Sequence, residues 1–122
     1  MSLYSAIGES FVRDAITEFY VRAFADPIIG HLFMHSDRAH ITKQQIDFAT
    51  NLLGGPRLYA GKSLREAHQR LPLKPTHFMR RQVIMREVLT DLGLDAELVA
   101  RWLALEDQLR ALIITDPRAC NT

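Results

Sequence analysis

The chain has 122 residues, of which 48% are hydrophobic, and its 15 Lys and Arg against 14 Asp and Glu give a net charge of +1. This is the composition of one soluble globular domain spanning 1–122, and the even balance excludes the clustered positive charge that nucleic-acid or anionic-membrane binding demands. With no apolar run of roughly 20 residues and no leader peptide, we expect a cytoplasmic protein. The single cysteine, Cys120, excludes an internal disulfide and a thiolate zinc cluster.

The first half of the chain predicts two long helices. Apolar residues recur at three- and four-residue steps over 10–25, and Asp26-Pro27 ends this helix. A short apolar segment over 28–34 predicts a brief helix or turn. Ser36-Asp37 then caps a helix that runs to about Leu53, where Gly54-Gly55-Pro56 prevents its continuation.

The second half predicts one very short helix and two long ones. Ser63 and Glu66 form a capping box for the short helix, which carries His68 and is followed by the rigid stretch LPLKP. Thr76 is expected to cap a helix from 77 to about 92, closed by Gly93, and Asp95 to cap the last helix, from 96 to about 114. No segment alternates with period two, so the predicted fold is all-α. The irregular middle third suits a plain four-helix bundle poorly, which indicates that something else organises the centre.

Two polar side chains fall on faces that are expected to be buried. Tyr20 lies beside Phe19 on the inner side of the first long helix, and Gln45 occupies an apolar position in the second. An unpaired buried hydroxyl or amide costs about 1 to 3 kcal/mol, so both side chains need partners, and each other is one candidate. Taken singly, each residue is more typical of a structural hydrogen bond.

The imidazole of His68 has apolar neighbours, Leu64 and Leu71, on its side of the short helix, so it lies at the border of the core or points inward. A haem would account for an apolar slot, an imidazole to hold iron, and aromatic residues around the macrocycle. Phe33, Phe48 and Phe78 supply the aromatics from three segments. The alternative is that these are ordinary core residues and that the protein is a haem-free helical interaction module.

Three other histidines, His31, His35 and His77, are candidates for metal or cofactor contacts. His31 and His35 have the spacing of a metal-binding pair, but no carboxylate or third histidine follows at a useful distance, which favours a solvated face. His77 directly follows the expected cap, where its cationic form is disfavoured, and we expect it to reach an anionic group such as a haem propionate.

The stretches LYSAIG, EFYVRAFADP, HLF, QQIDFATNLLGGPRLYAG and AHQRLP together resemble the truncated haemoglobins, whose fold is a two-over-two helical sandwich around one haem. The resemblance covers nearly the whole chain. It implies haem b as the cofactor, His68 as the proximal iron ligand, and Tyr20 and Gln45 as a distal hydrogen-bonding pair. It also implies a haem-lining set made up of Phe33, Ile41, Phe48, Tyr59, Leu64, Leu71, His77 and Phe78, with Ile41 guarding ligand entry.

The chain departs from the family pattern in two places. Gly8 is followed by Glu9 where the family usually has two glycines, and Arg81-Gln82 stands where two of the three groups commonly carry a tryptophan. Tyr20, Gln45 and GGPRLYAG are typical of group I, whereas LPLKP is similar to group III. The resemblance leaves the subgroup open, as well as whether His40 coordinates iron on the distal side.

The implied activity is binding of dioxygen or another diatomic gas, for oxygen transport, storage or sensing, with Tyr20 slowing release. An enzyme that converts nitric oxide to nitrate is the alternative. Because the sequence holds no flavin or nicotinamide motif, such an enzyme needs an external reductase as its partner.

Overall fold

The computed structural model describes residues 2–56 and 74–110, and all of the secondary structure in this part of the chain is helical. This confirms the all-α prediction. The short helix predicted after Ser63 and the predicted end of the last helix lie outside the described residues, as do Tyr59, Leu64, His68 and Leu71. The described elements, in chain order, are α1 (Leu3–Ile7), α2 (Glu9–Ala25), η1 (Gly30–Phe33), α3 (Arg38–Leu52), α5 (Pro75–Asp91) and α6 (Ala96–Gln108).

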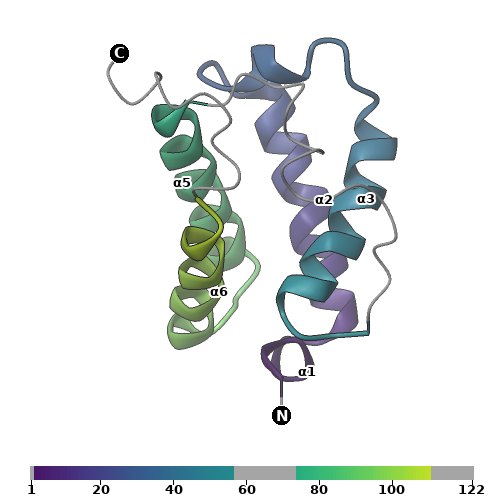
Figure 1. Ribbon diagram of the computed structural model, residues 1–122, viewed down its shortest axis with the longest axis vertical. Helices are drawn as coiled ribbons and strands as arrows, with labels where there is room; N and C mark the ends of the chain where they lie inside the picture. Colours follow the sequence, from purple (N-terminus) through teal and green to yellow (C-terminus); the bar gives the residue numbers. More distant parts are fainter. Residues whose placement is uncertain (1, 57–73, 111–122) are drawn as a thin grey trace.

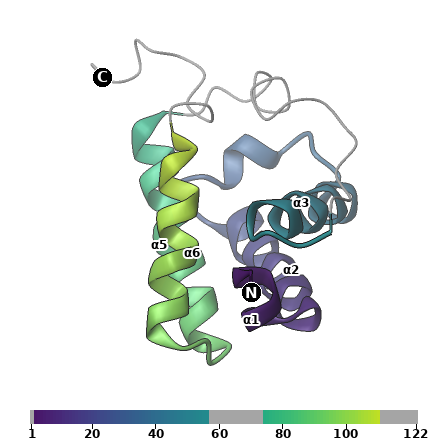
Figure 2. The same cartoon turned by 60° about the horizontal axis from the view of Figure 1, so that its bottom comes forward.

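The helices form two layers, and α2 packs against helices of both. It packs against α3 within its own layer and against α5 in the other, and α5 packs against α6 (Figure 1). Turning the molecule shows the pair α2 and α3 crossing the pair α5 and α6 (Figure 2). The predicted two-over-two sandwich is therefore confirmed. Among the described helices, none combines the length and the hydropathy needed to cross a bilayer.

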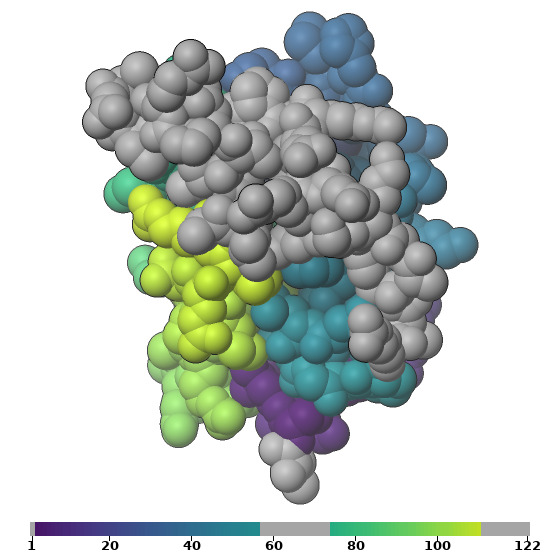
Figure 3. All heavy atoms as spheres, in the orientation of Figure 1, coloured from purple at the N-terminus to yellow at the C-terminus, as the bar shows by residue number. Residues whose placement is uncertain are grey.

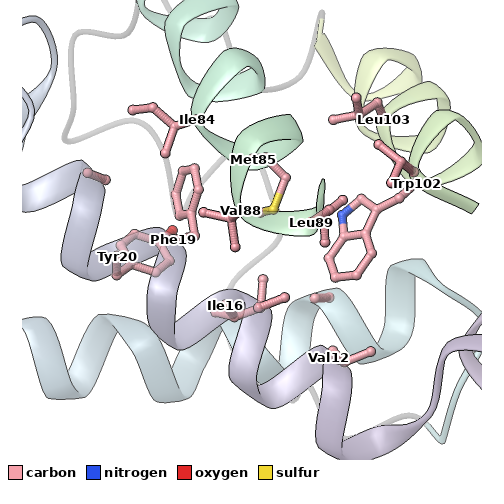
Figure 4. Packing of buried hydrophobic residues seen from close by; sticks show 14 of the residues in the cluster. Val12, Ile16, Phe19, Tyr20, Ile84, Met85, Val88, Leu89, Trp102 and Leu103 are labelled. Atoms are coloured by element: carbon pink, nitrogen blue, oxygen red, sulfur yellow. The ribbon is translucent and has the colours of Figure 1, made fainter. Parts of the chain in front are cut away.

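The core lies where α2, α5 and α6 meet (Figure 4). Trp102 of α6 is fully buried there and shares this core with apolar residues from the other two helices. Burying a side chain of this kind stabilises the fold by about 1.5 to 3 kcal/mol, so this three-helix junction holds the layers in a fixed relation. The residues that Figure 4 labels along these helices are Val12, Ile16, Phe19, Tyr20, Ile84, Met85, Val88, Leu89, Trp102 and Leu103.

Most of the helix ends lie where the capping residues in the sequence predict them. The Asp37 carboxylate accepts hydrogen bonds from the backbone N–H groups of Ala39 and His40, at 3.0 and 3.4 Å, and the Asp95 carboxylate accepts one from Glu97 at 3.1 Å. Gly54 and Gly93 follow α3 and α5 with φ of +89° and +90°, a conformation that side-chain-bearing residues rarely adopt.

The predicted cap of α5 is wrong. The helix begins at Pro75, and Thr76 is already inside it. Proline at the first position has its φ preset for a helix and needs no hydrogen-bond partner for its nitrogen. The backbone N–H of Lys74 instead donates to Nδ1 of His77 at 3.1 Å, so the histidine side chain takes part in capping.

Helix α1 lies outside the sequence predictions, because five residues make little more than one turn and carry no readable period. Its N-terminus is capped by the Ser2 hydroxyl, which accepts from the Ser5 N–H at 3.0 Å. Gly8, with φ of +96°, turns the chain directly into α2, so one glycine suffices where the family usually has two. On the face shown in Figure 3, α1 lies at the base of the molecule, beneath α6 and α3.

The second glycine after α3 has a steric role. A Cβ atom on Gly55 would lie 2.7 Å from the Tyr4 ring and 2.8 Å from the Thr50 methyl group. The Tyr4 backbone N–H also donates to the Leu53 carbonyl at 2.8 Å. The double glycine therefore lets α1 pack directly on the end of α3.

Candidate functional site

Tyr20 is the centre of a buried aromatic cluster near the C-terminal end of α2. Its side chain is 6% exposed, and it makes edge-to-face contacts with three phenylalanine rings, at centroid distances of 4.9 Å to Phe19, 5.9 Å to Phe33 and 6.4 Å to Phe24. Phe24 and Phe33 are themselves stacked at 4.9 Å. The phenol is thus held rigidly in surroundings that are almost entirely apolar.

A carboxylate holds the corner between α2 and η1 that carries Phe33. Asp26 Oδ2 accepts from the backbone N–H groups of Ile28 and Ile29, at 2.9 and 3.0 Å. Its Oδ1 accepts from Nε and Nη2 of Arg80 on α5, at 3.0 and 2.6 Å. The Arg80 guanidinium, helped by the two backbone donors and opposed by burial, lowers the pKa of Asp26. Asp26 therefore fixes this corner against α5.

Among the charged groups, the Arg81 guanidinium on α5 acts most strongly on the pKa of Tyr20, which its charge lowers. Arg81 Nη1 lies 3.1 Å from Glu106 Oε1 on α6, and the guanidinium also lies 5.1 Å from the centre of the Phe19 ring. Glu106 Oε2 accepts from the indole nitrogen of Trp102 at 3.2 Å. A buried polar chain therefore runs from Trp102 and Glu106 on α6 to Arg81 on α5, whose guanidinium lies beside the Phe19 ring.

Burial and charge act in opposite directions on these groups. Burial raises the pKa of Tyr20 to about 12, although the charge of Arg81 opposes that rise. Burial by itself would lower the pKa of Arg81, but the Glu106 carboxylate and the Tyr20 hydroxyl outweigh it, and the pKa lies above its ordinary value. At neutral pH the phenol therefore keeps its proton and the guanidinium its charge.

One face of α3 is less deeply buried than the apolar face of a helix that packs fully into a core. Ile41, Gln45 and Phe48 recur along one side of the helix and are all half-buried, whereas Ala49 and Leu53 are buried. No hydrogen bond joins Tyr20 to Gln45 within the described residues. The role of Gln45 stays a prediction.

Comparison with known proteins identifies the family. The model of the family described as "Bacterial-like globin" matches residues 2–114. A group 1 truncated haemoglobin from Tetrahymena pyriformis is 45% identical over 71 residues, which are 58% of this chain and 59% of that protein. The chain belongs to the truncated haemoglobin family. The aligned segment spans about three fifths of that relative's length, and its group 1 designation favours group I over group III for this chain.

Solved structures of truncated haemoglobins share the fold over nearly the whole chain. The Fe(III) form from Tetrahymena pyriformis superposes with a TM-score of 0.89 at 32% identity, covering 95% of this chain and all of that one. That protein has also been solved with a tyrosine replaced by phenylalanine, and with glutamine replaced by glutamate at either of two positions. The 2/2 haemoglobin from Synechococcus, in the cyanomet state and with covalently attached haem, gives a TM-score of 0.88 at 28% identity, covering 95% of this chain and all of that one.

The described residues of this truncated haemoglobin fit one side of a haem. A porphyrin is a flat apolar group, and the half-covered apolar side chains of Ile41 and Phe48 on α3 are of the kind that such a group would cover. Phe33 and Phe78 are buried, and Tyr20 supplies a protonated polar group. The family supports binding of a diatomic gas at a haem, and the nitrogen ligand expected for the iron, His68, lies outside the described residues.

None of the other described histidines is buried. His31, His35 and His40 are exposed, and His31 meets His77 edge-on at 5.6 Å between ring centres. In the described parts of the chain, no three His, Cys, Asp or Glu side chains are grouped as metal ligands. The alternative of a metal site at the His31 and His35 pair therefore gains no support here.

Sequence reasoning missed Arg81 and Glu106, although their spacing carried a signal. Arg81 falls three residues after Phe78 and four before Met85, on the buried face of α5. Glu106 falls four residues after Trp102 on the buried face of α6. One cation and one anion at apolar positions of neighbouring helices indicate a buried ion pair, because each would be costly to bury alone.

Proposed function

We propose that this truncated haemoglobin binds haem b through His68 and holds a diatomic gas, dioxygen above all, by a hydrogen bond from Tyr20. The observation that carries the proposal is the Tyr20 phenol, which is buried among aromatic rings and keeps its proton at neutral pH. A protonated phenol in an apolar cavity has a donor to offer and few acceptors with which to satisfy it.

Binding of the haem is assigned to apolar side chains from several elements. Phe33, Ile41, Phe48 and Phe78 come from η1, α3 and α5, and His77 at the start of α5 is assigned to a propionate. The haem supplies the iron at which the gas binds. The surrounding side chains exclude water and orient the macrocycle, which strengthens each polar contact inside the pocket. The segment outside the described residues would contribute Tyr59, Leu64, His68 and Leu71.

Tyr20 and Gln45 have different roles in the proposed site. The Tyr20 hydroxyl donates to the partial negative charge on the gas, and Gln45 orients that hydroxyl from α3. A charge-assisted hydrogen bond contributes about 1.5 to 3 kcal/mol, which corresponds to roughly 10-fold to 150-fold slower release. The hydrogen bond from Tyr20 therefore favours retention of the gas over rapid exchange.

The assignment of His68 as the iron ligand is tested with His68→Gly, which removes the imidazole side chain and leaves space for a free imidazole molecule. The purified wild-type protein should be red, with a Soret band that shifts between the ferric, ferrous and carbonmonoxy forms. His68→Gly should lose this spectrum and regain it when free imidazole is added, whereas the exposed control His35→Gly should keep it. A wild-type protein that folds fully but never takes up haemin would overturn the proposal in favour of a haem-free interaction module.

A further inference from the structure

The geometry points to Asp26 and Arg80 as a positioning pair that holds Phe33 and Phe78, two phenylalanines assigned to the haem, in a fixed relation to each other. Phe33 lies on η1 and Phe78 on α5, so the haem would contact side chains that belong to different elements. The contact between Asp26 and Arg80 joins these two elements. This inference rests on the proposed function, and it adds a requirement for two polar residues that stand outside the apolar haem-lining set.

Asp26 fixes the part of the chain that leads to Phe33. Its side chain is only 4% exposed, and Oδ2 accepts from the backbone N–H groups of Ile28 and Ile29 at 2.9 and 3.0 Å. Its backbone carbonyl accepts from the N–H of Gly30, the first residue of η1, at 2.8 Å. The corner between α2 and η1 is therefore tied to this one residue, and Phe33 follows in the same short helix.

Arg80 extends this arrangement to α5. Its Nε and Nη2 donate to Oδ1 of Asp26 at 3.0 and 2.6 Å, and its side chain is 30% exposed. The contact is charge-assisted and partly shielded from water, so it restrains the two elements more than an exposed ion pair would. Phe78 is fully buried and lies two residues before Arg80 on the same turn of α5. The pair thus links the corner of Phe33 to the turn of Phe78.

The other contact described between η1 and the start of α5 is of a weaker kind. The rings of His31 and His77 meet edge-on, with 5.6 Å between their centres, and His31 is exposed. Of these two contacts, only that of Asp26 with Arg80 is charge-assisted. We therefore assign the relation between the two elements chiefly to this pair.

A purely structural pair makes a different prediction. If the pair only stabilises the fold, its loss will lower the free energy of unfolding and will affect haem no more than any other destabilising substitution does. If the pair acts through Phe33, its loss will be felt by the haem only while the Phe33 ring is present. A double-mutant cycle separates these cases, because it measures whether two substitutions act independently.

The experiment measures the rate at which haem leaves the protein, by its transfer to an excess of a haem-free acceptor globin. It compares Arg80→Met with Arg80→Lys, each in the wild-type and Phe33→Leu backgrounds. Arg80→Met removes the cation but leaves the hydrogen bonds of Asp26 within its own corner. Arg22→Met is the matched control, because Arg22 also joins α2 to α5, through Asp91 at the opposite end of α5, at 2.9 Å.

We expect Arg80→Met to speed haem loss about 3-fold to 10-fold, because Phe33 loses its fixed relation to α5. Arg80→Lys should regain most of the wild-type rate, since both guanidinium nitrogens donate to a single oxygen and one ammonium group can take their place. Arg22→Met should leave the rate unchanged. In the Phe33→Leu background, Arg80→Met should have no further effect.

Two further variants guard against effects of stability alone. Leu53 is 2% exposed and lies at the end of α3, so Leu53→Ala should destabilise the core while leaving haem loss close to the wild-type rate. If Arg80→Met does not fold, Asp26→Asn should show the same acceleration, since it removes the charge and keeps an oxygen that can accept from the backbone.

Three results would overturn the inference: haem loss at the wild-type rate in both Arg80→Met and Asp26→Asn, an Arg80→Met effect of the same size with and without the Phe33 ring, or an equal acceleration in Leu53→Ala. Failure of the proposed function has a different signature. In that case the wild-type protein takes up no haem, or His68→Gly keeps the wild-type spectrum.

Discussion

The Tyr20 phenol combines burial, which opposes ionisation, with a neighbouring cation, which favours it. Burial prevails and raises the pKa to about 12, so the phenol keeps its proton at neutral pH. A hydroxyl with a lower pKa would give up its proton in mildly alkaline solution. At the scale of single residues, the proposed donor role of Tyr20 therefore depends on the burial of its phenol.

Replacement of Tyr20 by phenylalanine removes the donor and keeps the ring. We expect Tyr20→Phe to speed oxygen dissociation by roughly 10-fold to 150-fold, since it removes a charge-assisted hydrogen bond of about 1.5 to 3 kcal/mol. Stopped-flow mixing of the gas-loaded protein measures the rate. Tyr4→Phe, which removes a hydroxyl from α1, is the control and should change nothing. Equal rates for wild type and Tyr20→Phe would remove Tyr20 from the site.

The pKa of Tyr20 also predicts how the retention of bound oxygen depends on pH. Because the folded-state pKa of Tyr20 is about 12, the phenol keeps its proton throughout the range from pH 6 to about 10. The ratio of the dissociation rates of Tyr20→Phe and wild type should therefore stay constant across that range. A ratio that falls between pH 8 and 10 would mean that the phenol ionises far more readily than its burial implies.

At the scale of the elements, the corner between α2 and η1 depends on the contacts of Asp26 with Arg80. This carboxylate joins the end of one helix to the next segment and to α5, and it thereby fixes Phe33 against the Tyr20 ring. Gly30 permits the close approach that the corner needs, since a Cβ there would lie 2.8 Å from the Phe24 carbonyl oxygen. The aromatic cluster is positioned by this corner as much as by its own packing.

Removing the Asp26 charge should destabilise the protein in a pH-dependent way. Asp26→Asn leaves Arg80 without its anion, and we expect the free energy of unfolding at pH 7 to fall by about 1.5 to 3 kcal/mol. The pKa of Asp26 is lowered by folding, so its contribution is complete above the unfolded pKa of about 3.9 and is lost as pH falls through the lower folded value. The deficit of the variant, measured by denaturant unfolding, should therefore shrink below about pH 4.

A second acid-to-amide variant provides the comparison for Asp26→Asn. Asp91 pairs with Arg22 at 2.9 Å, but its side chain is 58% exposed. Asp91→Asn should cost no more than the roughly 0 to 1 kcal/mol that is typical of exposed ion pairs. Similar losses in the two variants would show that burial of Asp26 adds little to this contact.

These contacts separate the features that can be predicted from the sequence from those that require the tertiary structure. Asp37, Asp95, Gly54 and Gly93 act on their own helix ends, so their positions along the chain sufficed to predict them. Arg80, the partner of Asp26, comes from α5, and Glu106, the partner of Arg81, comes from α6, so finding these pairs requires the tertiary arrangement. Thr76 was mistaken for a cap because hydroxyl residues are good caps, whereas Pro75 had already started the helix.

At the scale of the whole molecule, α2 packs against helices of both layers and so connects the core to the candidate site. Its contacts with α5 belong to the core that also contains Trp102, while its Tyr20 end meets the aromatic cluster. By contrast, the face of α3 that carries Ile41, Gln45 and Phe48 is only half-buried among the described residues. Stability in the core and retention of haem should consequently respond to different substitutions.

Ile41 and Leu53 test that separation, because both are apolar residues of the same part of the chain. Leu53 is 2% exposed even without haem. Leu53→Ala should therefore lower the free energy of unfolding by about 2 to 5 kcal/mol, equally in the apoprotein and in the haem-loaded protein. Ile41 is only half-buried, and haem is expected to complete its burial, so Ile41→Ala should cost about 1 kcal/mol more in the haem-loaded protein than in the apoprotein. Denaturant unfolding of both forms measures the difference. An identical cost of Ile41→Ala in the two forms would mean that this face of α3 does not contact the haem, and the site would then have to lie elsewhere in the sandwich.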